Sequence, residues 1–194
     1  SLYRIDVDGR AAHAGLEPEK GVNAGVEVAH QILAVAALAD AERGTTVVPT
    51  ALSAGTTTNT VPAHAGVAVD VRVWDEAEQR RVDQVVRDLR PVLDGSRIRI
   101  SGGINRPPLQ EEASSGLFDL AATLAGELGL GILTAAAVGG ASDGNFTAGL
   151  GVPTLDGLGA VGGGAHADDE HVVVAELPRR TTLLTALIDA VLAK

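Results

Sequence analysis

The sequence of 194 residues contains no cysteine, no methionine and few aromatic residues, namely one Trp, one Tyr and two Phe. The lack of cysteine excludes a disulfide framework, a thiolate metal ligand and a cysteine nucleophile, so any metal site must use His, Asp or Glu. The shortage of aromatics means that the core is built from Val, Leu, Ile and Ala. With 45% hydrophobic and 21% charged residues, the composition is nevertheless that of an ordinary soluble globular protein.

Basic residues are also scarce: 15 Lys and Arg stand against 25 Asp and Glu, for a formal net charge of -10. Nucleic-acid binding requires a basic patch, so we expect no nucleic-acid partner. No run approaches the ~18 apolar residues of a membrane span, so we expect no membrane partner either. Position 1 is not methionine, so we expect a processed chain or a fragment. A cytoplasmic location is favoured, although the absence of a signal peptide then carries no information.

The hydrophobic pattern of the first half switches between period two and the helical period. Residues 2–8 and 67–73 alternate apolar with polar side chains, which indicates half-buried strands. Asp75 with Glu78 resembles a capping box at a helix start. The predicted order is strand, helix, strand, strand, helix, strand, over residues 2–8, 21–41 (ended by Gly44), 46–55, 67–73, 75–89 and 97–100. This order predicts an α+β ferredoxin-like (βαββαβ) domain in residues 1–104, with both helices on one face of the sheet.

Residues 105–194 have a different hydrophobic pattern, and Arg106 before two prolines marks the boundary between the two halves. A helix capped by Ser114 and a closing helix opened by Pro178 are predicted around two short apolar runs. The runs, 131–138 and 152–155, are typical of parallel strands buried on both faces. Two such strands are too few for an independent sheet, so this half is predicted to be part of an α/β domain whose remainder lies elsewhere.

His166 follows a run of glycines and precedes an acidic segment. Glycine-rich backbone approaches a ligand closely, and neutral imidazole is the commonest metal ligand. The ordinary alternative is an exposed loop histidine. A self-contained metal site of His166, Asp168, Glu170 and His171 is disfavoured, because the spacing is neither that of a helical histidine pair nor that of a calcium loop.

The segment Gly139 to Gly144, which includes Gly140 and Ser142, lies between a predicted strand and a helix start. Free N–H groups at a helix N-terminus bind anions such as a carboxylate. The alternative is that Ser142 or Asp143 is simply the N-cap.

Four further polar residues have ordinary explanations when each is taken alone. His13 is a loop histidine, Asn59 a turn asparagine, and Arg72 a partner of Asp70 in a surface ion pair. Arg106 is a boundary residue. The pair 111–112, two glutamates, invites a general-base interpretation, but it lies in a predicted linker and is discounted.

In combination and in this order, the motifs resemble the aminoacylase/glutamate-carboxypeptidase family of di-zinc metallopeptidases. The resemblance covers almost the whole chain, and the segments around His13 and His166 are its most specific parts. The matching motifs are Gly9 to Gly15 followed by Pro18, Gly21, Asn23 and Ala24, then Asn59 to Pro62, Asp70 to Arg72, Gly139 to Asp143, and Gly164 to His166 with Asp169 and Glu170.

The resemblance implies hydrolysis of an amide bond next to a free carboxylate, in a small peptide or an N-acyl amino acid. It implies two zinc ions per subunit, which share a carboxylate and a water, and a glutamate general base. It also implies residue roles, matched position by position: the last metal ligand is His166, and a histidine that stabilises the oxyanion in the partner's active site is His13. Substrate-binding positions are matched by Asn59, Arg72, Arg106, Gly140 and Ser142.

The remaining family ligands and the general-base pair precede the dimerisation domain, and this sequence has nothing there. We therefore expect this chain alone to bind no di-zinc centre and to hydrolyse nothing. One alternative is a non-catalytic homodimerisation or binding module; another is a separate chain that supplies the missing half. In each case an exposed edge strand of the first domain is expected to form a homodimer.

Overall fold

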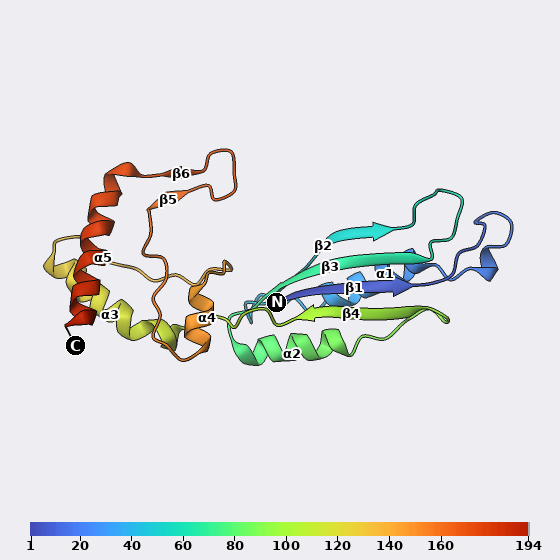
Figure 1. Ribbon diagram of the computed structural model, residues 1–194, viewed down its shortest axis with the longest axis horizontal. Helices are drawn as coiled ribbons and strands as arrows, with labels where there is room; N and C mark the ends of the chain where they lie inside the picture. The colour runs from blue at the N-terminus through green and yellow to red at the C-terminus, as the bar shows by residue number, and fades with distance from the viewer. Residues whose placement is uncertain (194) are drawn as a thin grey trace. The chain divides into compact units, whose positions relative to one another are not determined.

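The computed structural model describes residues 1–193, and the chain forms two compact units, Ser1–Pro108 and Leu109–Lys194. Unit 1 contains the predicted order of strands and helices, with one additional short turn of 3-10 helix (Figure 1). Its elements are β1 (Leu2–Asp8), η1 (Pro18–Lys20), α1 (Ala24–Ala36), β2 (Thr46–Ala54), β3 (His64–Arg72), α2 (Glu76–Arg87) and β4 (Arg97–Gly103).

The four strands of unit 1 form one sheet in the order β2-β3-β1-β4, and every neighbouring pair is antiparallel. In the central pair, Leu2 lies opposite Asp70 and Asp8 lies opposite His64. Strands β2 and β4 are the two edges. A register shift between Pro49 and Leu52 interrupts the pairing of β2 with β3.

One face of this sheet carries the core of unit 1. The alternation of β1 points Tyr3, Ile5 and Val7 to the same side, as period-two geometry requires. Both helices cover this side, because residues of α1 and of α2 belong to the same buried cluster. The cluster comprises Tyr3, Ile5, Val7, Ala24, Val28, Val35, Val47, Ala65, Val67, Val69, Val71, Val82 and Val86. Truncation of fully buried Ile5 to Ala is expected to cost ~2–5 kcal/mol.

Helix α1 is shorter than the predicted 21–41. It begins after Asn23, whose side chain accepts hydrogen bonds from the N–H groups of Gly25 (2.9 Å) and Val26 (3.1 Å). It ends at Ala36, so the prediction that Gly44 terminates it was wrong.

Gly44 instead allows the connection after α1 to pack beneath the indole of Trp74. Its φ is +63°, and a Cβ there would lie 2.1 Å from Trp74 Cδ2. A backbone pair between Asp40 and Thr45 closes the loop, with N···O distances of 3.0 and 2.8 Å. The Gly44–Trp74 packing and the Asp40–Thr45 pair therefore hold the loop between α1 and β2.

Unit 2 contains α3 (Glu111–Glu127), α4 (Gly144–Gly149), β5 (Gly162–Gly163), β6 (His171–Val172), η2 (Val174–Glu176) and α5 (Leu177–Leu192). The strands predicted over 131–138 and 152–155 are absent, and Ile132 is 94% exposed. A parallel strand forms only beside a neighbour, and no described strand lies next to either run. Ser114 lies within α3 rather than before it, so the predicted cap was also wrong.

None of the described helices combines the length with the apolar character that a membrane span requires.

Candidate active site

His13 and Asn59 lie together because two loops are joined by backbone hydrogen bonds. The N–H of Ala14 donates to the carbonyl of Asn59 (2.9 Å), and the N–H of Val61 donates to that of Ala12 (2.9 Å). His13 stands between these two bonds. The sequence predicted both residues as candidates, and the structure brings them to one place.

The same end of the sheet is fixed by close backbone packing. The N–H of Gly9 donates to the carbonyl of Ala63 (2.7 Å), and a Cβ on Gly9 would lie 2.1 Å from the carbonyl oxygen of Val22. The N–H of Ala24 donates to the carbonyl of Pro62 (2.9 Å), which attaches the start of α1 to the loop of Asn59. Glycine at position 9 is thus a steric requirement of the His13 loop.

Arg72, the last residue of β3, forms the predicted ion pair with Asp70. Arg72 Nε donates to Asp70 Oδ1 (2.9 Å), and Nη2 approaches Asp70 Oδ2 (3.4 Å). Hydrogen bonding to this carboxylate raises the pKa of the Arg72 guanidinium. The pair is partly exposed, so it orients the guanidinium more than it stabilises the fold.

Arg106 shares this end of the sheet with Arg72. Its carbonyl accepts a hydrogen bond from Gln79 Nε2 (2.8 Å), which attaches the segment after β4 to α2. Burial lowers the pKa of the Ser1 amino group, and Asp70 opposes that shift. The positive charges of Arg72 and Arg106 lower this pKa further. The guanidinium groups of Arg72 and Arg106, both candidate substrate-binding residues, therefore both lower the pKa of the Ser1 amino group.

The two pairs of candidates lie at opposite ends of the sheet. β3 begins with His64, opposite Asp8, just before the His13 loop, and it ends with Arg72. Eight residue steps at ~3.3 Å each separate these ends by roughly 26 Å. Within one chain, the structure brings His13 to Asn59 and Arg72 to Arg106, but it does not bring the two pairs together.

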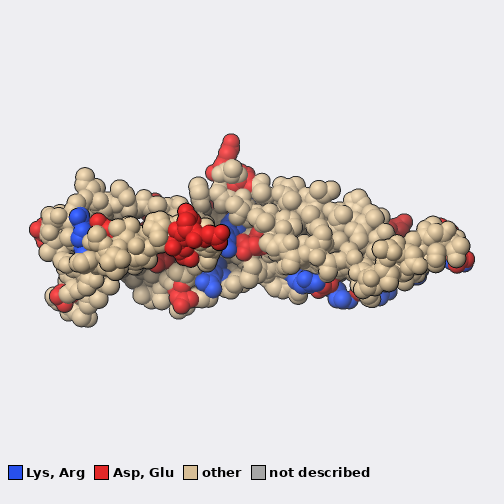
Figure 2. Space-filling model, turned by 90° about the horizontal axis from the view of Figure 1, so that it is seen from above, with Lys and Arg blue, Asp and Glu red and all other residues tan. Residues whose placement is uncertain are grey.

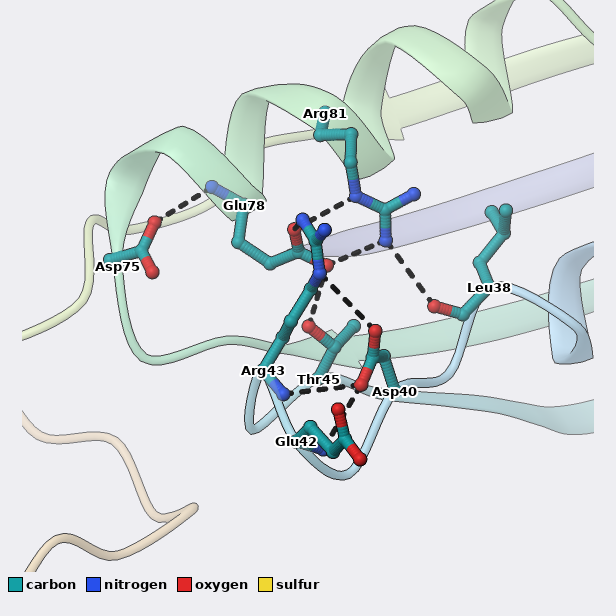
Figure 3. A network of polar contacts seen from close by, with 8 residues as sticks. All are labelled: Leu38, Asp40, Glu42, Arg43, Thr45, Asp75, Glu78 and Arg81. Atoms are coloured by element: carbon teal, nitrogen blue, oxygen red, sulfur yellow. Dashed lines mark hydrogen bonds and ion pairs between the residues drawn. The ribbon is translucent and has the colours of Figure 1, made fainter.

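A polar network that sequence reasoning did not find supports the Arg72 end (Figure 3). Glu78, only 4% exposed, accepts from Thr45 Oγ1 (2.7 Å) and from Arg81 Nη2 (2.6 Å) and Nε (2.8 Å). Its own N–H donates to Asp75 Oδ1 (2.8 Å), which is half of the predicted capping box. The carboxylate does not return the contact, because it is directed toward Thr45 and Arg81.

The Arg81 hydrogen bond is the main cause that lowers the pKa of Glu78 to about 2. Asp75 and Glu78 were a sequence signal for a helix start. Only the fold shows that Glu78 also attaches α2 to the loop before β2.

The segment around Ser142 forms its own local hydrogen bonds. Ser142 Oγ accepts from the N–H of Gly144 (3.1 Å), and Asn145 Oδ1 accepts from the N–H of Ser142 (2.9 Å). A hydrogen bond from Ser142 also lowers the pKa of Asp156. These contacts close a local turn just before α4, whose N-cap residue Asp143 makes no side-chain cap hydrogen bond. Gly140 lies in the preceding segment without helix or strand.

His166 lies in the loop between β5 and β6. Its φ is +65°, and it is the only non-glycine residue among the described residues whose φ is positive. Such a conformation costs of order 1–3 kcal/mol and is concentrated at functional sites. The loop is closed by hydrogen bonds from the N–H of Ala167 to the carbonyl of Gly164 (2.8 Å) and from the N–H of Glu170 to that of Ala167 (3.1 Å).

The donor groups of the described residues do not fit a complete zinc centre. No three His, Asp or Glu side chains within residues 1–193 are grouped so that they could hold a metal ion. His166 offers one imidazole, whereas a catalytic zinc takes three protein ligands.

Residues 2–94 match the model of the peptidase dimerisation domain family. Over 97% of its length the chain is 28% identical to carboxypeptidase G2 of Pseudomonas sp. (strain RS-16), of which it covers 46%. Over 96% of its length it is 24% identical to the uncharacterized protein YqjE of Bacillus subtilis (strain 168), of which it covers 50%. The chain thus spans about half the length of these curated relatives.

Solved structures show the same similarity. The aminopeptidase PepT of Bacillus cereus superposes with a TM-score of 0.76 and 25% identity, over 100% of this chain and 52% of that one. A tripeptidase of Staphylococcus aureus superposes with a TM-score of 0.64 and 19% identity, over 100% of this chain and 52% of that chain, which supports the fold alone.

Proposed function

We propose, from the match of residues 2–94 to the model of the peptidase dimerisation domain family, that this chain is part of a homodimeric zinc-dependent peptidase or amidohydrolase. Carboxypeptidase G2 and the aminopeptidase PepT are both named as peptidases, which supports a hydrolase as the parent protein. The proposed reaction is hydrolysis of an amide bond next to a free carboxylate, in a small peptide or an N-acyl amino acid. The supporting observation is that the candidate residues lie in two pairs, His13 with Asn59 at one end of the sheet and Arg72 with Arg106 at the other.

The proposed domain assignment follows the same family. Residues 1–104 would be the dimerisation domain, of ferredoxin-like class, and 105–194 the C-terminal part of an α/β catalytic domain. The antiparallel order β2-β3-β1-β4 with two helices on one face supports the first assignment. The apolar runs without strand partners in unit 2 support the second, since such runs need neighbouring strands.

Strand β2 is the edge best suited to pair with a second copy. It contains no charged residue, and its side chains Val48 and Leu52 are 49% and 58% exposed. Figure 2, which views the molecule from the β2 side of Figure 1, shows that this side of unit 1 is mostly uncharged. The opposite edge, β4, carries Arg97 and Arg99, and charges on an edge strand oppose pairing.

Helix α1 extends this uncharged surface. Its one acidic residue, Glu27, is buried, whereas Leu33 is 70% and Val26 is 45% exposed. Exposed apolar patches of this kind mark interfaces. A homodimer formed through β2 and α1 would bury them.

Two-fold pairing of β2 with its copy would complete the divided site. Thr46 at the start of β2 lies opposite Arg72, and Ala54 at its end lies opposite Ala65, next to the start of β3. Antiparallel pairing about a two-fold axis places the end of one β2 beside the start of the other. The His13 end of one chain would then approach the Arg72 end of its partner, and each active site would use residues from both chains.

Mixing of inactive variants tests the composite site in the complete protein. His13→Ala and Arg72→Ala are each expected to be inactive as homodimers. After subunit exchange, half of the dimers are mixed, and each mixed dimer has one intact site, so roughly a quarter of the activity returns. A mixture of His13→Ala with Asn59→Ala is the matched control and stays inactive. His13 and Asn59 come to each site from the same chain, so every site of a mixed dimer lacks one of them.

Failure of the first mixture to regain activity would reject the composite site. Lack of amidase activity in the complete wild-type protein would reject the hydrolase. The second candidate function, a non-catalytic homodimerisation module, is favoured only by the absence of a grouped metal site among the described residues. A separate chain that supplies the other ligands would co-purify with this one.

A further inference from the structure

The ring of His13 is held by the backbone of its own loop. Its Nδ1 accepts hydrogen bonds from the N–H groups of Gly15 (3.1 Å) and Leu16 (3.2 Å). The turn that carries these groups is closed by a bond from the N–H of Glu17 to the carbonyl of His13 (3.2 Å). A backbone N–H is always the donor, so Nδ1 must be the acceptor in both contacts.

We infer that this loop fixes neutral His13 in the tautomer with its proton on Nε2, and that the backbone N–H groups of Gly15 and Leu16 are its positioning groups. A neutral imidazole carries one N–H and one acceptor nitrogen. Two donors already point at Nδ1, so the ring proton resides on Nε2.

The other histidines with ring contacts show the opposite pattern. His64 Nδ1 lies 2.9 Å from Asp8 Oδ1, and His171 Nδ1 lies 2.9 Å from the carbonyl of Asp169. Hydrogen bonding to His64 lowers the pKa of the Asp8 carboxyl, so this group is an ionised acceptor at neutral pH. In both cases Nδ1 must donate and therefore carries a proton. The chain thus contains its own references for a protonated Nδ1.

The tautomer restricts what His13 can do. A histidine that binds a metal through Nε2 carries its proton on Nδ1 and donates it to a neighbouring acceptor. At His13 the groups that face Nδ1 are themselves donors, the N–H groups of Gly15 and Leu16. The same holds for a general base acting through Nε2, which must keep its proton on Nδ1. What His13 presents is an Nε2–H donor, suited to an electron-rich oxygen such as the oxyanion of an amide under attack. This functional meaning depends on the proposed hydrolase; the tautomer does not.

Nitrogen chemical shifts of the imidazole rings test the inference. The 194-residue chain is labelled with ¹⁵N, and long-range proton–nitrogen spectra are recorded at mildly alkaline pH, where neutral rings predominate. His13→Gln assigns the His13 signals. We expect an unprotonated Nδ1 in His13 and a protonated Nδ1 in His64 and His171. A protonated Nδ1 in His13, or the averaged shifts of a freely exchanging ring, would overturn the inference.

Two substitutions at the exposed Leu16 test the positioning groups. Leu16→Pro removes the backbone N–H, whereas the matched Leu16→Ala keeps it. Leu16→Pro should move the His13 nitrogen shifts toward those of an averaged ring, and Leu16→Ala should not. Unchanged shifts in a folded Leu16→Pro would show that the backbone does not select the tautomer. If Leu16→Pro unfolds the loop, the wild-type spectrum still decides.

Activity of the complete protein distinguishes the donor role from a structural one. His13→Gln places an amide N–H near the position of Nε2, while His13→Asn places an acceptor near that of Nδ1. We expect His13→Gln to retain more kcat than His13→Asn, at similar KM. Equal kcat would reject the donor role. The nitrogen shifts are measured without substrate or zinc, so their failure leaves the proposed function standing, and an inactive parent leaves the tautomer standing.

Discussion

Gln31 Nε2 donates a hydrogen bond of 2.6 Å to Oε1 of Glu27, one turn earlier in α1, and both side chains are buried. The Glu27 carboxylate also accepts from the N–H groups of Val92 (3.0 Å) and Leu93 (2.7 Å) and from Ser96 Oγ (3.0 Å). Burial opposes ionisation of Glu27, but these hydrogen bonds outweigh it and lower its pKa. A buried charge therefore attaches α1 to the connection between α2 and β4.

Substitution of Glu27 by Ala should destabilise unit 1 strongly. It leaves the buried donors of Gln31 and Ser96 and the partly buried N–H groups of Val92 and Leu93 without their acceptor, at ~1–3 kcal/mol for each donor that is buried. We expect a loss of about 3–5 kcal/mol in the free energy of unfolding, as the sum of these lost acceptors, measured by urea titration. The control is Glu76→Gln, which breaks an exposed pair with Arg80 worth only ~0.3–0.5 kcal/mol. Equal losses in the two variants would contradict a structural role for the buried carboxylate.

Acid should weaken unit 1 through Glu78. Its pKa is about 2 in the folded chain, below the ordinary 4.5. A lowered pKa means that the stabilisation is complete above the unfolded value and is lost as the pH falls toward the folded one. The unfolding midpoint in urea should therefore fall between pH ~4.5 and ~2, and Glu78→Gln should reduce this dependence. An unchanged slope in the variant would assign the acid sensitivity to other groups.

Replacement of Gly44 by Ala should displace Trp74. The φ of +63° and the 2.1 Å approach to Trp74 Cδ2 both oppose a Cβ. We expect a loss of at least ~1 kcal/mol and a shift in emission of Trp74, the only tryptophan. Gly116 in α3 has no atom within 4 Å of its notional Cβ, so Gly116→Ala should stabilise by ~0.5–1 kcal/mol. An unaltered emission spectrum in Gly44→Ala would refute the packing argument.

The chain of 194 residues should be a dimer that depends on β2. Light scattering coupled to gel filtration should give twice the chain mass of 19.6 kDa. Val48→Lys places a charge on the uncharged edge and should yield monomers. Ser101→Lys on the other edge strand, β4, is the control and should leave the dimer intact. Monomers produced only by Ser101→Lys would move the interface to β4.

The same chain should bind no stoichiometric zinc and should lack amidase activity. Its described residues contain no grouped ligand set, and a catalytic zinc requires three protein ligands. Elemental analysis and an assay with N-acyl amino acids check both expectations beside the longest natural form of the protein. In that longer form, His166→Ala should lower the zinc content. About two zinc ions per short chain, with metal-dependent hydrolysis, would contradict the expectation.

Local patterns in the sequence were sufficient for most of unit 1. The alternation of Tyr3, Ile5 and Val7 predicted β1 with its bounds, and the pattern of 67–73 located β3. Asp75 located the start of α2. These features depend on neighbours a few residues apart, and period two or a capping side chain reports them directly.

Predictions failed where distant residues decide the structure. Helix α1 ends at Ala36, and the loop after it packs through Gly44 against Trp74, thirty positions away in sequence, a contact that no local signal reports. The runs 131–138 and 152–155 have strand-like composition, but no described strand lies beside them. Composition gives a tendency to form a strand, whereas hydrogen bonding to a neighbour makes one.

The candidate site divides in the same way. The sequence by itself determined which residues are candidates, because His13, Asn59, Arg72 and Arg106 are recognisable by type and motif. Only the tertiary structure decided which of them meet. Since β3 is an extended strand of nine residues, it separates the His13 end from the Arg72 end. Neither this separation nor the hydrogen bonds of the His13 ring can be read from spacing along the chain.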